Sequence, residues 1–360
     1  MELDSKIYIA GHRGLVGSAL VRCLKTQGYN NLILRTHKEL DLLDQRAVRE
    51  FFAEAKPEYV FLAAARVGGI VANNTYPAEF IYQNIVIQQN VIHEAWQAGV
   101  KRLFFLGSSC IYPRECPQPM KEEYLLTGPL ESTNRPYAVA KIAGIEMCWA
   151  YNRQYGTRFF AVMPTNLYGP GDNYDLQNSH VLPALIRKFH LAKLASCGDI
   201  AGIERDEKIN GPIPQDIREA ICLSSANCQL ATENSSPKVV LWGTGTARRE
   251  FLYSDDMADA CLHLMKLPED QYSSLLTAHC APLINIGCGD DQTIKEMVFL
   301  VQQVVGFPGE IQWDTTKPDG TPQKLLDVSK LFSMGWRPQI DLVSGIQKAY
   351  DDFLSGRSES

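Results

Sequence analysis

The chain has no long apolar run, no block of like charge and no C-x2-C pair. Its apolar runs end short of the roughly 18 residues that a membrane-spanning helix needs. The formal net charge of −6 is spread along 360 residues, which leaves no electrostatic footprint for nucleic acid or for an anionic membrane. The first residues lack a basic segment followed by an apolar core, so we expect no signal peptide. These absences predict a cytoplasmic protein without nucleic-acid or membrane partners.

Cysteine is not scarce, with 10 in the chain, but its spacing indicates neither a disulfide framework nor a zinc site. Cys23, Cys148 and Cys261 lie within apolar runs, as buried structural thiols do. We therefore expect reduced thiols and no bound metal. The length allows a large core, in one unit or in two packed lobes.

A glycine-rich loop follows the first predicted strand, at residues 6–10. Gly11-x2-Gly14-x2-Gly17 leads into a helix expected over residues 18–27. In a dinucleotide-binding unit the first glycine allows a tight turn, the second lets the backbone approach a pyrophosphate, and the third packs the helix on the strand. The spacing differs from the usual G-x-G-x2-G, but strand, loop and helix occur in the required order. We therefore predict a dinucleotide site here.

The end of the second predicted strand indicates which dinucleotide binds. An NAD-binding unit usually places Asp or Glu there, to bind the ribose 2′-OH. Here the strand over residues 31–35 ends in Arg35, followed by His37 and Lys38, and Arg13 lies in the glycine loop. Cationic side chains suit a 2′-phosphate, so we predict NADP rather than NAD. The alternative is that these are solvated loop charges.

Predicted strands and helices alternate through the first half of the chain, with strands at 59–65, 102–107 and 158–163 and helices at 45–55, 80–98 and 135–152. This alternation predicts an α/β fold with a Rossmann-type, doubly wound parallel sheet. Ligand sites of such sheets lie at the carboxyl ends of the strands. Residues 107–110 and 164–170 fall at such ends.

The pattern loosens in the second half of the chain. We predict an NADP-binding domain over residues 1–170, with strands returning to it near 238–256 and 283–287. Residues 171–360 are expected to form mainly a smaller α+β lobe that binds the substrate.

One helix carries a possible acid–base pair. Tyr137 and Lys141 lie four residues apart in the helix expected over residues 135–152, so one side chain sits above the other. A neighbouring ammonium favours the phenolate and lowers a phenol pKa that is otherwise about 10. Y-x3-K alone is a weak signal, and an ordinary surface pair is the alternative.

The glycine loop, Ser108 and Tyr137-x3-Lys141 together resemble the extended short-chain dehydrogenase/reductases. The likeness covers nearly the whole chain and is strongest in six blocks, at residues 6–17, 65–77, 107–113, 163–170, 178–183 and 317–322. It implies an NADPH-dependent enzyme that inverts C3 and C5 of GDP-4-keto-6-deoxy-D-mannose and then reduces the C4 ketone, giving GDP-L-fucose. The shared motifs also allow a 3,6-dideoxy keto sugar leading to GDP-L-colitose. A non-catalytic, redox-sensing NADP-binding regulator is a further alternative.

The resemblance implies roles for five catalytic residues. Cys110 and His180 are similar to the family's epimerisation pair, and thiol and imidazole are groups whose pKa values come near neutrality with modest shifts. Tyr137 would protonate the C4 oxygen, Ser108 would hydrogen-bond it, and Lys141 would lower the phenol pKa and hold the nicotinamide ribose.

The resemblance also implies binding residues. Those expected to contact the cofactor are Gly11, His12, Arg13, Gly14, Leu15, Val16, Gly17, Arg35, His37, Asp41, Leu42, Leu106, Gly107, Ser108, Ser109, Lys141, Pro164, Thr165, Asn166, Leu167 and His180. Those expected to bind the GDP-sugar are Lys188, Trp242, Arg249, Asp319 and Lys324, with Lys188 and Arg249 suited to the diphosphate. Arg187 is an equal candidate for the phosphate role.

Two further expectations concern the surface. Family members pair through the helices that begin near Phe80 and Pro136, so we expect a homodimer. Residues 195–237 depart from the family, because its compact members lack roughly forty of these residues. They are polar and irregular, apart from a possible short helix near 217–223. We favour a surface excursion over a lid or a subunit contact.

Overall fold

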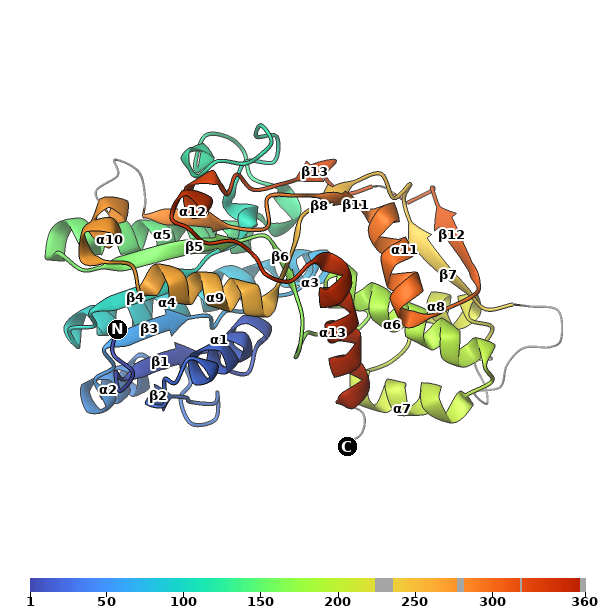
Figure 1. The fold of residues 1–360 in the computed structure, drawn as a ribbon, viewed down its shortest axis with the longest axis horizontal. Coiled ribbons are helices and arrows are strands. Elements are labelled where there is room, and N and C mark those ends of the chain that lie inside the picture. Colours follow the sequence, from blue (N-terminus) through green and yellow to red (C-terminus); the bar gives the residue numbers. More distant parts are fainter. Residues whose placement is uncertain (224–235, 277–281, 318, 357–360) are drawn as a thin grey trace. The chain divides into compact units, whose positions relative to one another are not determined.

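The computed structural model describes residues 1–223, 236–276, 282–317 and 319–356. The chain divides into two compact units (Figure 1). The first comprises residues 1–167, 250–289 and 325–339, and the second comprises residues 168–249, 290–324 and 340–360. Among the described residues, no helix is both long enough and apolar enough to cross a membrane.

The first unit is built on a six-stranded sheet in the order β10-β5-β4-β3-β1-β2. All neighbouring strands in it run parallel. The strands are β1 (Ile7–Ala10), β2 (Leu32–Ile33), β3 (Tyr59–Leu62), β4 (Arg102–Leu106), β5 (Phe159–Pro164) and β10 (Leu283–Ile286). The predicted Rossmann-type sheet is confirmed.

Helices cover both faces of this sheet, because the strands are apolar on both faces. The α-helices of the unit are α1 (Leu15–Thr26), α2 (Gln45–Ala55), α3 (Ile70–Thr75), α4 (Pro77–Gln97), α5 (Arg135–Tyr155), α9 (Ser254–Met265), α10 (Glu269–Leu276) and α12 (Ser329–Ser333). Short 3-10 turns occur at η1 (Ser109–Ile111), η2 (Glu122–Tyr124) and η3 (Ser132–Asn134), and β9 (Phe251–Tyr253) pairs with β6 (Asn166–Tyr168).

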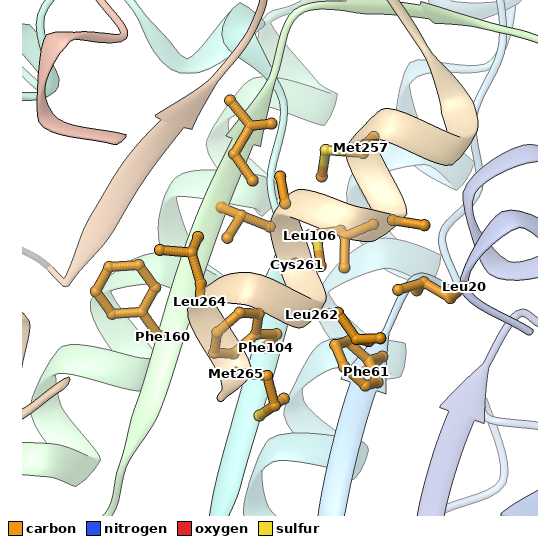
Figure 2. Packing of buried hydrophobic residues seen from close by; sticks show 14 of the residues in the cluster. Leu20, Phe61, Phe104, Leu106, Phe160, Met257, Cys261, Leu262, Leu264 and Met265 are labelled. Atoms are coloured by element: carbon orange, nitrogen blue, oxygen red, sulfur yellow. The ribbon is translucent and has the colours of Figure 1, made fainter. Parts of the chain in front are cut away.

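Alternate residues of each strand pack into two different hydrophobic cores, one on each face of the sheet. Helix α9 lays Cys261 and Leu264 on one face, against Phe104 of β4 and Phe160 of β5 (Figure 2). On the other face, α2, α4 and α5 pack against residues such as Phe105, the neighbour of Phe104 in β4. This alternation is what a doubly wound sheet requires, because successive side chains of a strand point to opposite faces.

The second unit contains two small sheets and five helices within the described residues. Its strands are β7 (Lys238–Trp242) paired with β12 (Glu310–Asp314), and β8 (Arg248–Arg249) between β11 (Gln292–Thr293) and β13 (Gln323–Lys324). Its helices are α6 (Val181–Ser196), α7 (Ile200–Asn210), α8 (Gln215–Ala220), α11 (Ile294–Val305) and α13 (Leu342–Ser355).

Two expectations about the second half differ from the structure. Strand β7 pairs in parallel with β12 in the second unit and does not return to the large sheet. Residues 200–210 form helix α7, where an irregular segment was expected. Asp199 caps this helix by accepting a hydrogen bond from Gly202 N at 2.8 Å, and its inner face carries Ile203, which is fully buried. Residues 224–235 of the expected irregular segment lie outside the described residues.

Candidate functional site

The glycine loop joins β1 to α1 at the carboxyl edge of the large sheet. Gly11 has φ +84°, and a Cβ on Gly17 would lie 2.0 Å from Gly11 O. These two glycines are therefore required by the turn and by the packing of α1. Gly14 is different, because a Cβ there would meet nothing closer than 3.5 Å. The backbone at Gly14 is therefore open at the helix start, the kind of place where a pyrophosphate can approach.

The residues of the loop fit a dinucleotide with an extra phosphate. His12 Nδ1 is buried without a hydrogen-bond partner in the described structure, which marks a polar atom that a ligand could satisfy. Burial is the main cause that lowers the pKa of His12, and Arg13 adds to it. Arg13 of the glycine loop and Arg35, two residues after β2, both have exposed side chains.

An acid that sequence reasoning missed lies among these cations. The Glu39 carboxylate accepts hydrogen bonds from Thr36 N at 2.7 Å and Thr36 Oγ1 at 2.8 Å. These bonds are the largest causes that lower its pKa, and the charges of Arg35 and Arg13 lower it further. Glu39 comes four residues after Arg35. It therefore lies beyond the strand end, where NAD-binding units usually place the acidic residue that binds the ribose 2′-OH. Both bonds end on Glu39 Oε2 and keep the carboxylate charged, so the site retains a cationic face only because two arginines accompany this one acid.

The remaining cofactor candidates of the first unit follow the carboxyl ends of β2, β4 and β5. Asp41 Oδ1 lies 3.6 Å from His37 Nε2. Gly107 packs closely on β5, since a Cβ there would lie 2.1 Å from Met163 Cε and would displace that side chain. The other candidates are placed along this edge or on α1 and α5: Leu15, Val16, Leu42, Leu106, Ser108, Ser109, Lys141, Pro164, Thr165, Asn166 and Leu167.

Four predicted catalytic residues come together where β4 meets α5. Ser108 caps η1, and its Oγ accepts a hydrogen bond from Cys110 N at 3.5 Å. The Ser108 hydroxyl also hydrogen-bonds the Tyr137 phenol, and Cys110 is close enough to influence the pKa values of both Tyr137 and Lys141. Lys141 Nζ lies 5.7 Å from the centroid of the Tyr137 ring. Hydroxyl, thiol, phenol and amine thus share one location.

Burial, rather than charge, dominates the electrostatics of this cluster. Lys141 is 3% exposed, and desolvation lowers its pKa to about 8. Its Nζ donates to Leu106 O at 2.8 Å and lies 4.7 Å from the Phe105 ring centroid. Burial raises the pKa of Tyr137 well above its ordinary value, and the Ser108 hydrogen bond opposes this only in part. We expected Lys141 to lower the pKa of Tyr137, but in this structure burial raises it instead.

A buried glutamate orders the end of β5, and no sequence motif pointed to it. Glu250 O accepts hydrogen bonds from Thr165 Oγ1 at 3.2 Å and Asn166 Nδ2 at 2.8 Å. Its carboxylate is fully buried and accepts from Gly289 N at 2.7 Å and Leu326 N at 3.0 Å. Burial raises the pKa of Glu250, and these bonds oppose the rise. Glu250 thus fixes the strand end that carries Asn166.

The second unit gathers the residues expected to bind the nucleotide sugar. Lys324 of β13 lies beside Arg249 of β8 in parallel register, so the two cations can share a face of the small sheet. Asp319 accepts hydrogen bonds from Thr244 N at 2.9 Å and Thr244 Oγ1 at 2.8 Å, which ties it to the turn after Trp242. Two of its acceptor positions are therefore already used by the protein.

Lys188 and Arg187 are neighbours in α6 with opposite environments. Lys188 lines a cavity together with Trp242, which is 62% exposed. Arg187 is fully buried, and its Nε donates to Asp206 Oδ2 at 2.7 Å. Its other nitrogens donate to Tyr174 O, Asn210 O and Gly211 O, at 3.1, 2.6 and 2.5 Å. The expectation that Arg187 is an equal candidate for phosphate binding is therefore wrong.

His180 stands at the N-terminus of α6, in the second unit, whereas Ser108, Cys110, Tyr137 and Lys141 belong to the first unit. Desolvation lowers the pKa of His180 below its ordinary value. An imidazole that is neutral near pH 7 can accept a proton and return it.

Comparison with known proteins shows the family of the chain. The model of the NAD dependent epimerase/dehydratase family matches residues 7–204 and 207–276. The chain is 52% identical to a protein named putative GDP-L-fucose synthase 2 from Arabidopsis thaliana, over 98% of this chain and 93% of that protein. It is 48% identical to GDP-L-fucose synthase from Escherichia coli, over 98% and 97%. A GDP-L-colitose synthase from Yersinia pseudotuberculosis is 32% identical, over 98% and 99%.

Solved structures are similar over the same length. A GDP-D-glycero-L-gluco-heptose synthase from Campylobacter jejuni, determined in the presence of NADPH, matches with a TM-score of 0.87 and 43% identity, over 98% of this chain and 99% of that one. A GDP-mannoheptose C4 reductase from the same organism, with NADP bound, matches with a TM-score of 0.82 and 42% identity, over 98% and 99%.

Proposed function

The chain belongs to the NAD dependent epimerase/dehydratase family, and we propose that it uses NADPH to convert GDP-4-dehydro-6-deoxy-D-mannose to GDP-L-fucose. The observation that carries this proposal is the cluster of Ser108, Cys110, Tyr137 and Lys141 at one strand end. A reductase needs the hydroxyl, phenol and amine of this cluster, and an epimerase also needs a base such as the thiol. The Arabidopsis thaliana and Escherichia coli relatives named for this product are 52% and 48% identical to the chain.

The cofactor is NADP. The relevant features of the chain are the open backbone at Gly14, the unpartnered His12 Nδ1 and the exposed cations Arg13 and Arg35. NADPH, when bound, supplies the hydride that reduces the C4 ketone. We assign the 2′-phosphate to Arg13 and Arg35, because a guanidinium can bind a phosphate through two parallel hydrogen bonds.

In the reduction, Tyr137 donates its proton to the C4 oxygen as that atom becomes an alkoxide. The raised pKa of Tyr137 keeps the phenol protonated and therefore able to act as the acid. The Ser108 hydroxyl donates a second hydrogen bond to the same oxygen. With its pKa lowered only to about 8, Lys141 is still mainly charged at pH 7, and its charge stabilises the oxyanion.

In the epimerisations, a proton alpha to the ketone leaves one face of the sugar and another returns to the opposite face. This requires a base and an acid on opposite faces of the ring, for which we propose Cys110 and His180. The Ser108 and Tyr137 hydroxyls then stabilise the enediolate oxygen. A reduced thiol is needed at Cys110, which fits the reducing cytoplasm that we propose for this chain.

The second unit is proposed to hold the GDP moiety. Arg249 and Lys324 offer two adjacent positive charges for the diphosphate. Trp242, Lys188 and Asp319 complete the proposed set of contacts, with Trp242 offering an exposed aromatic face.

A colitose-type substrate is the second candidate, and sequence identity makes it less favoured. The relative named for that product shares 32% of its residues with the chain, against 48% for the Escherichia coli relative named for GDP-L-fucose. The two substrates differ in whether C3 carries a hydroxyl.

The decisive assay gives the enzyme NADPH and either GDP-4-dehydro-6-deoxy-D-mannose or its 3-deoxy analogue. We expect NADPH oxidation with the first substrate, and NMR of the product should identify GDP-L-fucose. A Tyr137→Phe variant is the matched control, because it removes one hydroxyl from the proposed acid. Oxidation of NADPH with the 3-deoxy sugar alone, or with neither sugar, would contradict the proposal.

We further propose a homodimer formed through α4 and α5. These helices pack against each other, and they carry apolar side chains that remain exposed, among them Tyr82 at 64% and Val139 at 40%. A second copy would cover these side chains and form a four-helix bundle. Light scattering at micromolar concentration tests this proposal, and a monomeric mass would refute it.

A further inference from the structure

Residues 200–221 form an ordered part of the second unit. Helices α7 and α8 are joined by the ion pair of Arg218 with Glu207, and Arg218 Nε also donates to Ile213 O at 3.2 Å. The fully buried ion pair of Arg187 with Asp206 fixes α7 to α6. Arg218 thus fixes α8 to α7, and α7 is in turn fixed to α6.

Helix α8 forms one wall of a cavity of about 220 Å³. The other walls come from α6, from β7 and from the residues at and after the end of β12. Ile217, Ile221 and Val239 give the cavity apolar sides, and Lys188 and Asp216 place opposite charges in its lining. The other charged residues of the lining are Lys238, Asp314 and Lys317. Apolar walls with a few polar groups are what a flat heterocyclic base requires.

The two charges act on each other. Desolvation lowers the pKa of Lys188, and the charge of Asp216 opposes this effect. Asp314, the other carboxylate of the lining, uses its Oδ1 to accept hydrogen bonds from Thr316 N at 3.1 Å and Thr316 Oγ1 at 2.5 Å. Asp216 is the carboxylate whose charge acts on Lys188, so it is the one we pair with Lys188.

An ammonium next to a carboxylate is complementary to guanine. One edge of guanine presents the O6 acceptor, then the N1–H and 2-amino donors. Adenine presents an amine in place of O6 and an acceptor at N1, so it would place a donor against the ammonium and an acceptor against the carboxylate.

We propose that Lys188 and Asp216 read the guanine base of the nucleotide sugar. Lys188 donates to O6, and the Asp216 carboxylate accepts from N1–H and the 2-amino group. The inference rests on the proposed function, because it presumes a GDP-sugar. It moves Lys188 from the diphosphate, where sequence reasoning put it, to the base, and it leaves the diphosphate to Arg249 and Lys324. The segment expected to be a surface excursion thereby supplies a specificity residue.

The test measures binding of GDP, IDP and ADP to the NADP-loaded protein by titration calorimetry. IDP keeps O6 and N1–H but lacks the 2-amino group. Wild type should bind GDP about 10-fold more tightly than IDP, and ADP more weakly still. In Asp216→Asn, GDP affinity should fall roughly 10- to 100-fold, and the ratio of GDP to IDP affinity should fall towards 1.

Glu219→Gln is the matched control, because it also neutralises a carboxylate of α8 but one outside the cavity lining. Its side chain is exposed and accepts from Gln215 Nε2 at 2.9 Å, so nucleotide binding should not change. Equal losses of GDP and IDP affinity in Asp216→Asn would overturn the base-reading role. Unchanged GDP affinity in Asp216→Asn would also overturn that role, provided that the wild-type protein turns over the keto sugar. If wild type bound no GDP at all, the proposed function would fail as well.

Discussion

Replacing Arg187 by Met separates a structural arginine from a ligand-binding neighbour. The guanidinium is fully buried, pairs with the fully buried Asp206 and donates to three backbone carbonyls. Removing one partner of such an ion pair costs about 3–5 kcal/mol, because the other charge stays buried. A loss of about 4 kcal/mol corresponds to a change of nearly 10³-fold in the unfolding equilibrium.

The assay is amide hydrogen exchange of α6 and α7, combined with denaturant unfolding. Arg187→Met should lose protection in α7 by a factor of about 10²–10³. The neighbouring Lys188→Met should keep that protection and lose nucleotide binding instead. Adding Asp206→Leu to Arg187→Met should restore part of the stability, since no buried charge is then left behind. Wild-type protection in Arg187→Met, together with weaker nucleotide-sugar binding, would show that Arg187 is a ligand and that this reasoning is wrong.

Three further predictions concern the first unit. Gly17→Ala should unfold or lose NADPH binding, because its Cβ would lie 2.0 Å from Gly11 O, whereas Gly14→Ala should keep its melting temperature and bind NADPH more weakly; equal melting temperatures for the two would contradict this. The pKa of Lys141 is about 8 in the folded protein, against an ordinary value of 10.5, so below pH 8 the side chain is charged in both the folded and the unfolded state. Between these two values the unfolded chain holds more protons than the folded one. The stability of wild type relative to Lys141→Met should therefore rise as pH rises from 8 to 10. Parallel urea-unfolding stabilities across that range would refute the burial effect. Glu250→Ala should destabilise the cofactor-free protein by about 1–3 kcal/mol, because the amides of Gly289 and Leu326 lose their buried acceptor, and unchanged denaturant unfolding would count against that role.

The sequence predicts the large sheet well, because the two patterns that indicate it can be read from short stretches of the chain. Apolar strands alternate with amphipathic helices, and glycines mark the turn before α1. It does not predict α7, because polar residues dominate the segment and the helix depends on two distant contacts, Arg187 with Asp206 and the packing on α6. Strand β7 was misplaced for a related reason: an apolar run predicts a strand but does not say which sheet it joins.

The candidate site divides in the same way. Tyr137 and Lys141 could be proposed because their spacing forms a recognisable, though weak, motif, and Ser108 could be proposed from the resemblance to a known family. Glu250 and Asp216 could not, since each becomes informative only when folding brings it beside residues far away in the chain. The direction of the Tyr137 pKa was also beyond the sequence, because a neighbouring lysine is visible in a motif but the extent of burial is not.

The most direct test of the account follows solvent deuterium during turnover, by NMR, in Cys110→Ser and Tyr137→Phe. The account predicts that Cys110→Ser loses exchange at C3 and C5 of GDP-4-dehydro-6-deoxy-D-mannose. Tyr137→Phe should retain measurable exchange but reduce C4 at least about 10²-fold more slowly than wild type. Wild-type exchange in Cys110→Ser, or wild-type reduction in Tyr137→Phe, would contradict the claim that this one cluster serves both reactions.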